Sequence, residues 1–451
     1  MALTQDTIAA LATPTGTSAI AVLRISGPDT ERLTREIVGE LPLPRTAQRT
    51  DYRDAAGILV DDVLLTFFRG PASYTGDDTV EISCHGNPFI AQRLLEDFLR
   101  RGCRPAQAGE FTQRAFLNGQ MDLSQAEAVM DLIHARGERA LAAANLQLRG
   151  SLGRHMSELI EGLLAVLAQI EVSIDFPEDD LPPADQQRVG MALRKLADST
   201  SKLLATNHYG NILRDGLKTV ILGEPNAGKS SLLNRLVGHE RALVSNEPGT
   251  TRDYLEERLM LGDHCLRLID TAGLNPSPAQ LEQRGIEKSL ERMAEADLIL
   301  LVLDASKAPP PLPDSVRGHL NPANTLIIQN KSDLAPASQS DPALAEFESI
   351  TTSALTGAGF DVLQSALIRR AESFHVELGS DLVAINARHA DALSRAQTCL
   401  TAAATQLEAA EPIELVASEL RGALAAYGEI SGQVDNERML DHLFSSFCIG
   451  K

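Results

Sequence analysis

The feature that most constrains this chain is a glycine-rich stretch, Gly223–Ser230, which fits the pattern Gly-x-x-x-x-Gly-Lys-Ser. A short apolar run, Thr219–Leu222, precedes it, and a helix-like run, Ser231–Val237, follows it. In such a loop, glycines allow backbone N–H groups to point at phosphate oxygens where a helix begins. The order strand, phosphate loop, helix predicts a nucleotide-binding α/β domain.

Two residues of this loop have a defined chemistry. We expect the Lys229 ammonium to reach the β- and γ-phosphates and the Ser230 hydroxyl to bind Mg²⁺. Further short apolar runs, at 266–269, 298–303 and 325–329, alternate with helix-like stretches. This alternation predicts a parallel sheet covered by helices.

Three polar segments follow apolar runs of this domain. Asp270 of the segment Asp270–Gly273 can hold the Mg²⁺ shell, and the Gly273 N–H can meet the γ-phosphate. The Asp333 carboxylate of Asn330–Asp333 can accept the N1 and 2-amino N–H donors of guanine, a pair that adenine lacks. Ser353–Leu355 would bring a backbone N–H near guanine O6. The four motifs in this order predict GTP as the nucleotide.

The segment between the phosphate loop and Asp270 contains Pro248–Asp253, where the first switch of a GTPase belongs. Thr250 or Thr251 is expected to complete the Mg²⁺ coordination when the γ-phosphate is present.

Leu274 follows Gly273, at a position where many GTPases carry a water-orienting glutamine. Because an apolar side chain cannot polarise water, hydrolysis needs another polar group and another positive charge, and Asn226 could ligate a monovalent cation there. The candidate GTP-binding residues are Asn226, Ala227, Gly228, Lys229, Ser230, Ser231, Ser245, Asn246, Glu247, Pro248, Gly249, Thr250, Thr251, Asp270, Thr271, Ala272, Gly273, Asn330, Lys331, Asp333, Ser353, Ala354 and Leu355.

Length and composition limit the rest of the chain. The 451 residues suggest about three domains. A net charge of −20 argues against bulk electrostatic binding of nucleic acid, although it allows a local basic patch or an RNA docked jointly with a partner. No apolar run approaches a membrane span, and no Lys or Arg precedes Arg24, so we expect a cytoplasmic protein without membrane contact.

The segments that flank the α/β domain differ from it. Residues before about 120 have an α+β pattern, with a hairpin expected around Asp61-Asp62 and a helix over 89–101. A helical period then begins near Leu123, where Ser124 and Glu127 fit a capping box. Because helical patterns occur on both sides of the α/β domain, we expect one helical domain with the α/β domain inserted.

Several further segments are specific in combination. They are Leu23–Pro28, Ser73–Asp77, Val80–Ile82, Gly109–Thr112, Arg114–Gly119 and the tail Phe447–Lys451. With them, essentially the whole chain resembles the MnmE (TrmE) family of tRNA-modifying GTPases. The resemblance implies a multidomain α/β and α fold. Its parts are an α+β folate-binding and dimerisation domain (1–120), an all-α helical domain in two parts (121–214 and 376–451, ending in the Cys-Ile-Gly-Lys tail) and an inserted Ras-like P-loop G domain (215–375).

The resemblance also implies an activity. Family members are homodimers that hydrolyse GTP with K⁺ stimulation and work with an FAD-dependent partner of the MnmG (GidA) type, in a heterotetramer or larger complex. Together they add an aminomethyl or carboxymethylaminomethyl group to C5 of the wobble uridine of certain tRNAs. The one-carbon unit comes from a tetrahydrofolate derivative, in the 5-formyl or methylene form.

Site residues carry over from the family position by position. Mg²⁺ would be held by Ser230 and Thr251, and K⁺ by Asn226, Ser245, Glu247 and Thr250. Glu282 matches the water-orienting carboxylate. Folate contacts fall to Arg24, Glu81, Gln120 and Lys451, with Gln120 standing where the family often has a lysine. Cys448 would lie near the folate and the uridine as a second catalytic residue.

A different class of function is the alternative. A regulatory or ribosome-assembly GTPase would hydrolyse GTP without modification chemistry. Such proteins usually append a second G domain or a basic RNA-binding module, whereas the parts appended here are acidic helices and a folate-type N-terminal region.

Overall fold

The computed structural model describes residues 6–175, 183–239, 256–270, 290–308, 312–334, 344–374, 383–432, 443–444 and 447–450. It divides into two compact units, each built from separate stretches of the chain. The first contains Met1–Met130, Leu148–Val189 and Ala402–Lys451, and the second contains Asp131–Gln147 and Gly190–Thr401. In the described ranges, no helix has the length and apolar character needed to cross a bilayer.

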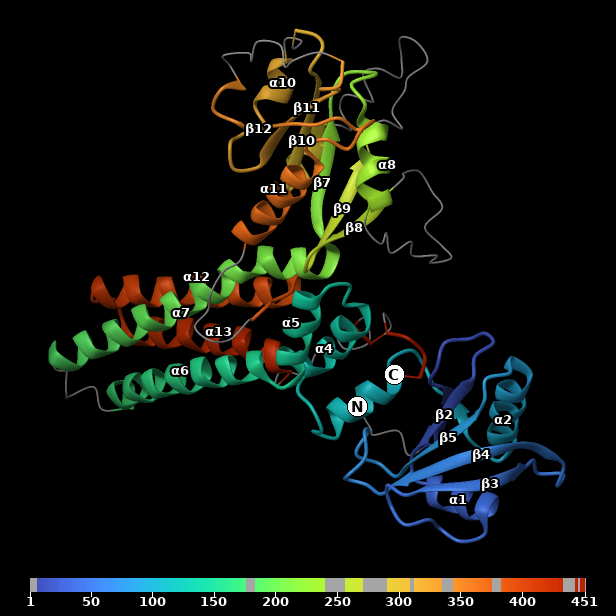
Figure 1. Ribbon diagram of the computed structural model, residues 1–451. Helices are drawn as coiled ribbons and strands as arrows, with labels where there is room; N and C mark the ends of the chain where they lie inside the picture. The colour runs from blue at the N-terminus through green and yellow to red at the C-terminus, as the bar shows by residue number, and fades with distance from the viewer. Residues whose placement is uncertain are drawn as a thin grey trace, which may run out of the picture. The chain divides into compact units, whose positions relative to one another are not determined.

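The first unit contains a six-stranded sheet of order β3-β4-β5-β2-β1-β6 (Figure 1). Its strand pairs are antiparallel except for the parallel pair β1–β6. Leu33 of helix α1 and Leu94 and Phe98 of helix α2 are buried against one face of the sheet, with Leu23 and Leu65. The elements are β1 (Ile8–Leu11), β2 (Ile20–Ser26), α1 (Thr30–Val38), β3 (Ala47–Arg53), β4 (Leu59–Phe68), β5 (Thr79–His85), α2 (Pro88–Arg100) and β6 (Arg104–Pro105).

The hairpin expected around Asp61-Asp62 is wrong, because β4 runs through both residues without a turn. Asp62 pairs with Arg49 of the neighbouring strand at 2.5 Å, and Asp61 accepts hydrogen bonds from the backbone and the ring of His85. Cross-strand partners therefore satisfy two carboxylates that look like turn residues in sequence. The turn lies at Asp54–Gly57, where the Asp54 carboxylate accepts the N–H groups of Ala56 and Ile58.

Helices form the remainder of the first unit and connect it to the second. In the first unit α6 packs beside α13, and Arg421 of α13 pairs with Glu171 of α6 at 2.5 Å. The helices outside the two sheet domains are α3 (Glu110–Leu117), α4 (Leu123–His134), α5 (Glu138–Leu148), α6 (Ser151–Asp175), α7 (Pro183–Asp215), α12 (Ala387–Glu408) and α13 (Ile413–Ser431).

The start of α4 corrects a second expectation. Ser124 and Glu127 lie inside the helix and are buried, so they do not form its cap. Instead, the Asp122 side chain accepts the Gln125 N–H at 2.8 Å, and the Gln125 side chain accepts the Asp122 N–H at 2.9 Å. This reciprocal pair is a capping box displaced by two residues from the expected one.

The second unit contains another six-stranded sheet, of order β12-β11-β10-β7-β9-β8. It is not purely parallel as expected, because the edge strand β8 is antiparallel to β9. Leu261 pairs with His264, which leaves a two-residue turn at Gly262-Asp263 that only antiparallel strands can use. The elements are β7 (Leu217–Leu222), α8 (Lys229–His239), β8 (Glu256–Leu261), β9 (His264–Asp270), β10 (Leu298–Asp304), α10 (Asp314–Arg317), β11 (Thr325–Asn330), β12 (Glu348–Thr351) and α11 (Phe360–Ser373).

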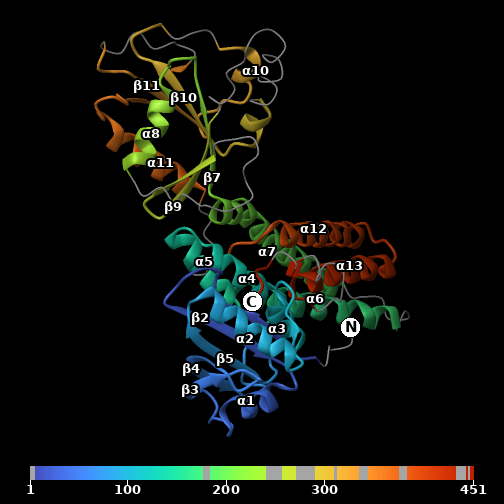
Figure 2. The same ribbon diagram turned by 90° about the vertical axis from the view of Figure 1, so that its right-hand side faces the viewer.

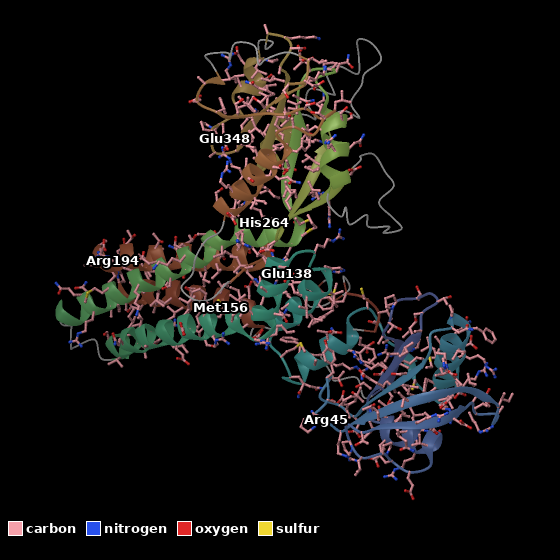
Figure 3. All side chains as sticks on the ribbon, in the orientation of Figure 1. Arg45, Glu138, Met156, Arg194, His264 and Glu348 are labelled. Atoms are coloured by element: carbon pink, nitrogen blue, oxygen red, sulfur yellow. The ribbon has the colours of Figure 1, made fainter. Side chains whose placement is uncertain are left out.

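Both faces of this sheet are buried. Helices α8 and α11 are labelled beside the sheet in Figure 2. Leu232 and Leu236 of α8 and Leu363 and Leu367 of α11 pack with the strand residues of one face. The strand residues that point the other way, such as Val220, are buried as well, as expected for strands covered on both sides. Glu348 of β12, labelled in Figure 3, pairs with Arg369 and Arg370 and so fixes α11 to the sheet edge.

Candidate functional site

The phosphate loop requires glycine at two positions. Gly223 has φ +148°, and a Cβ there would lie 2.2 Å from the Val302 carbonyl oxygen. Gly228 has φ +96°, and a Cβ there would lie 2.2 Å from Asn330 Nδ2. Helix α8 begins directly afterwards at Lys229, so its N-terminal N–H groups and positive dipole end face the loop. The loop is therefore built for an anion.

The side chains of the loop are accessible to a ligand. Lys229 Nζ donates to the carbonyls of Gly223 and Glu224, both at 2.8 Å. Ser230, Ser231 and Asn226 are exposed. Asn226 has φ +64°, a left-handed conformation that asparagine tolerates better than most residues. In this conformation its amide stands on the loop surface beside the phosphate-binding backbone.

One buried side chain joins three of the predicted motifs. Asn330 is 1% exposed, and its Nδ2 donates to the Ala227 carbonyl of the phosphate loop at 3.0 Å. Its Oδ1 accepts the Ala354 N–H at 2.9 Å. The segments that sequence analysis assigned to phosphate and to base are therefore adjacent in space.

The base-reading segments are held by their own contacts. The Ser353 hydroxyl donates to Asp333 Oδ1 at 2.5 Å and accepts the Thr356 N–H at 3.1 Å. Lys331 Nζ lies 2.7 Å from Asp304 Oδ2, and this contact, with that of Ser306, lowers the pKa of Asp304 to about 2. Asp333 is exposed, and Leu355 is 79% exposed, so both are available to a base.

Two residues at this site escaped sequence analysis, Asp304 and Arg235. Asp304 ends β10 and holds Lys331, while Arg235 of α8 donates to three carbonyls of the loop 354–356. Neither belongs to a recognised motif, and Arg235 is 119 to 121 residues from its acceptors. No local pattern in the sequence could have indicated such a contact.

Part of the predicted site lies outside the described residues. This holds for Ser245–Thr251, for Thr271–Gly273, for Glu282 and for Lys451. Asp270 is the last residue of β9. The roles expected for these residues stay predictions.

A second cluster lies on the first unit, where Arg24 of β2 is paired with Glu81 of β5. Arg24 Nε and Nη2 lie 3.0 and 2.8 Å from Glu81 Oε1. Its guanidinium carbon is 5.1 Å from the ring centre of Tyr74 and 5.6 Å from that of Phe111, within the range of cation–π contact. Arg24 and Glu81, predicted separately, are thus neighbours in one charged and aromatic cluster.

The C-terminal tail reaches this cluster. Arg24 Nη1 donates to the Gly450 carbonyl at 3.3 Å, Ile449 forms a β-bridge with Ala108, and the Gly109 N–H donates to the Cys448 carbonyl at 3.3 Å. The Cys448 side chain is exposed. The tail is therefore docked through its backbone, and the Cys448 thiol lies at the surface.

Gln120 lies close to the same region. Its backbone N–H donates to the Ala115 carbonyl, and its Nε2 would be 3.2 Å from a Cβ added at Gly76. Gly76 is two residues after Tyr74, whose ring contacts Arg24. Gln120 is exposed and uncharged, so it can donate a hydrogen bond but cannot neutralise an anion.

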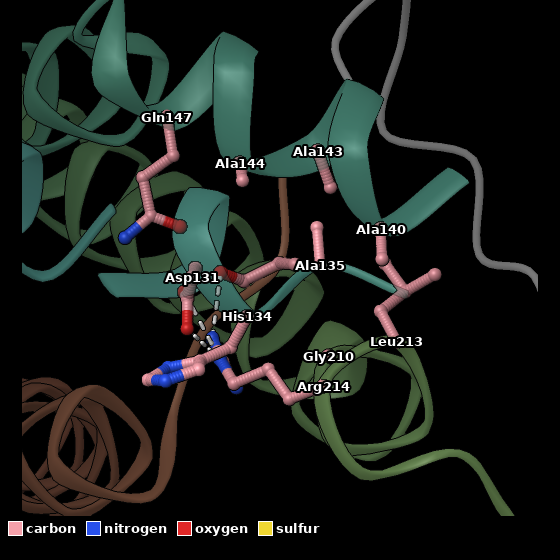
Figure 4. Close-up of a pocket in the computed structure, with 11 residues that line it drawn as sticks. Asp131, His134, Ala135, Ala140, Ala143, Ala144, Gln147, Gly210, Leu213 and Arg214 are labelled. Atoms are coloured by element: carbon pink, nitrogen blue, oxygen red, sulfur yellow. Dashed lines mark hydrogen bonds and ion pairs between the residues drawn. The ribbon is translucent and has the colours of Figure 1, made fainter. Parts of the chain in front are cut away.

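A small cavity in the second unit is lined by residues that belong to neither of these clusters (Figure 4). It measures about 50 Å³, room for only a few waters. Arg214 at its wall lies 3.1 Å from Asp131 and donates to the carbonyls of Ile385 and Ala384 at 3.1 and 3.4 Å. Arg214 thus links the chain segment before β7 to the segment after α11. The cavity therefore lies at a structural junction.

A glycine phosphate loop, an Asn-x-x-Asp segment beside it and a six-stranded sheet with one antiparallel edge define the class of P-loop GTP-binding proteins. Two family models match the chain, "GTP-binding protein TrmE N-terminus" over residues 7–120 and "MnmE helical domain" over 123–448. The "tRNA modification GTPase MnmE" of Opitutus terrae is 57% identical over 448 residues, 99% of each chain, and that of Akkermansia muciniphila is 46% identical over 452 residues, again 99% of each. The chain belongs to the MnmE family.

The predicted family and fold class are confirmed by these matches: a TrmE-type N-terminal domain, a helical domain and a P-loop G domain. Among solved structures, the G domain of the FeoB iron transporter of T. maritima is 25% identical, with a TM-score of 0.26, and covers 34% of this chain and 98% of its own. Because that score is low, the G-domain assignment rests on the motifs and the strand order described above.

Proposed function

We propose that this chain is a GTP hydrolase that modifies tRNA together with an FAD-dependent partner of the MnmG (GidA) type. The reaction adds an aminomethyl or carboxymethylaminomethyl group to C5 of the wobble uridine, using a tetrahydrofolate one-carbon unit. The observation that carries this proposal is the 57% identity, over 99% of each chain, to a protein named tRNA modification GTPase MnmE. A homodimer and a cytoplasmic location stay predictions.

The guanine base is read, in this proposal, by Asp333. Its Oδ1 is held by the Ser353 hydroxyl, which orients the carboxylate plane while the side chain stays exposed. A carboxylate in this position accepts the N1 and 2-amino N–H groups of guanine as two charge-assisted hydrogen bonds.

Asp333→Asn is expected to lower the preference for guanine by ~2–3 kcal/mol, because asparagine offers one acceptor and an amide donor in place of two acceptors. The same donor suits the 2-oxo group of xanthine. Competition between GDP and XDP measures the change. Asp361→Asn, an exposed aspartate of α11, is the control and should leave the preference unaltered. If the variant still rejects XDP and binds GDP normally, Asp333 does not read the base.

The oxygen donors in and near the phosphate loop suit hard cations. The Ser230 hydroxyl and the Asn226 amide are exposed, and neither side chain hydrogen-bonds to another residue in the described ranges. Mg²⁺ would be held by Ser230 with Thr251, and K⁺ by Asn226 with Ser245, Glu247 and Thr250. Hydroxyl and carbonyl oxygens are the ligands that such ions prefer. A bound K⁺ supplies positive charge where phosphate charge develops during hydrolysis.

Glu282→Ala is expected to impair GTP hydrolysis and to leave GTP affinity nearly unaltered. The carboxylate is assigned to orienting the attacking water, which matters in the transition state and little in the ground state. Single-turnover rates and nucleotide Kd values separate the two effects. Glu291→Ala, an exposed glutamate further along the chain, is the matched control. A large loss of affinity with normal turnover would give Glu282 a structural role instead.

The folate derivative would bind at the cluster of Arg24, Glu81 and the tail, with Gln120 and Lys451. The pairing of Arg24 with Glu81 and with the Gly450 carbonyl supports this assignment, because it brings a guanidinium, a carboxylate and the Tyr74 ring together over the buried Phe111 ring. A flat heterocycle with N–H donors and an anionic tail needs such groups. Gln120 lacks the charge of a lysine, so this chain has one cation fewer for that tail.

Mass spectrometry of wobble nucleosides from cells that lack this protein tests the proposal directly. Loss of the C5 modification, restored by the wild-type gene, is the expected result. Unaltered nucleosides together with sedimentation of the protein with ribosomal subunits would instead indicate a ribosome-assembly GTPase. Copurification with an FAD protein is expected only for the modification enzyme.

A further inference from the structure

The loop that follows β12 is held by an arginine from the phosphate-loop helix. Arg235 Nη1 donates to the carbonyls of Ala354 and Leu355 at 3.2 and 2.9 Å, and Nη2 donates to that of Thr356 at 3.1 Å. The guanidinium carbon lies 5.6 Å from the ring centre of Phe360. One side chain therefore orients three successive carbonyl groups.

The fit between this guanidinium and the loop is close. Gly357 has φ +89°, and a Cβ there would lie 2.1 Å from Arg235 Nη2. The loop is also closed on itself, since the N–H groups of Thr356 and Gly357 donate to Ser353 Oγ and O. The carbonyls of residues 354–356 are thus fixed on the side of the loop that faces Arg235.

The direction of one N–H group follows from this arrangement. In a planar trans peptide the carbonyl and the next N–H point in opposite directions. Holding the Ala354 carbonyl toward Arg235 therefore turns the Leu355 N–H away from it. The neighbouring Ala354 N–H is taken by Asn330 Oδ1, whereas within the described ranges the Leu355 N–H donates no hydrogen bond.

We propose that Arg235 is a positioning residue for base recognition, which aims the Leu355 N–H at guanine O6 by holding the Ala354 carbonyl. The proposal rests on the GTP binding proposed above. It assigns the recognition of O6 to one backbone group and gives that group a support on the helix that also binds phosphate.

The test compares two nucleotides that differ at this contact. GDP has O6, while the diphosphate of 2-aminopurine riboside keeps the 2-amino group and lacks O6. Arg235→Met removes the donors and keeps an unbranched apolar stem against Phe360. We expect it to weaken GDP binding about three- to tenfold, the size of one lost hydrogen bond, and the 2-aminopurine nucleotide less than about twofold. Arg235→Lys keeps a point charge without the planar fork, so an intermediate loss is expected.

Arg370→Met is the matched control. Arg370 also donates to a backbone carbonyl, that of Ala323 at 2.9 Å, and pairs with Glu348, but it contacts none of the nucleotide loops. Its GDP to 2-aminopurine ratio should equal that of the wild type. Because the readout is a ratio within one preparation, lowered stability of a variant does not alter it.

Equal weakening of both nucleotides by Arg235→Met would assign Arg235 a merely structural role and overturn the inference. An unaltered GDP affinity would do the same. A wild-type protein that does not prefer GDP to the 2-aminopurine nucleotide would instead refute the proposed guanine site, and the inference with it.

Discussion

Cys448→Ser is expected to abolish modification of the wobble uridine while K⁺-stimulated GTP hydrolysis continues. The thiol is exposed, and its residue is docked through the bond from the Gly109 N–H to its carbonyl. Serine has nearly the same shape and keeps that backbone contact, but its hydroxyl is a far weaker nucleophile than a thiolate. The tail and the phosphate loop belong to different compact units, so we expect hydrolysis to continue without the thiol.

Both activities are to be measured in one preparation, with tRNA and the FAD partner added. Cys399→Ser, in the middle of α12, controls for the loss of a thiol as such and should modify tRNA at the wild-type rate. Full modification by the Cys448→Ser variant would reduce Cys448 to an ordinary tail residue. Loss of both activities in that variant would show that the tail supports the G domain as well.

Replacing K⁺ by Na⁺ at constant ionic strength is expected to slow GTP hydrolysis by up to ~10³–10⁵, the range that an arginine finger supplies in other GTPases. The expectation depends on Leu274, which cannot orient water, and on Asn226, whose amide oxygen is exposed on the phosphate loop. Because no arginine finger is assigned in addition to Lys229 and Mg²⁺, the monovalent cation has to supply the further positive charge.

Asn226→Gly removes the amide oxygen and keeps the backbone conformation, so it tests the oxygen as a cation ligand. Glycine adopts φ +64° without strain, so the loop keeps its shape while the amide is lost. This variant should bind GDP like the wild type and show little response to K⁺. Equal wild-type rates in the two salts would refute the cation hypothesis.

Sequence alone predicted a GTP-binding domain because the residues of its motifs stand at fixed spacings. Gly223 and Gly228 leave no space for a side chain against Val302 and Asn330, and Asp333 is the carboxylate that the proposal assigns to the guanine edge. Such requirements appear in sequence as fixed spacings. Arg235 and Asp304 serve the same site, but their partners are protein groups brought near by the fold, so no spacing indicates them.

Local patterns failed where two arrangements satisfied the same rule. Asp122 with Gln125 and Ser124 with Glu127 both fit a capping box, but the first pair carries reciprocal hydrogen bonds at the helix start, whereas the second lies inside the helix. Asp61-Asp62 suggested a turn because aspartate favours turns, whereas the strand is stabilised there by partners elsewhere in the sheet. A second local pair decided the first case, and partners on neighbouring strands decided the second.

The contact of Arg214 with the Ile385 carbonyl has a consequence for chain entropy. It joins residues 171 apart, and closing a flexible loop of that length costs about 4.5 kcal/mol. Once the inserted domain has folded, its two ends are already close together. The burial of its own core has then offset most of the loop-closure entropy. The helices before and after the insert then behave as if joined by a short link. If the nucleotide-binding domain folds first, it therefore acts as a structured loop that favours pairing of α7 with α12.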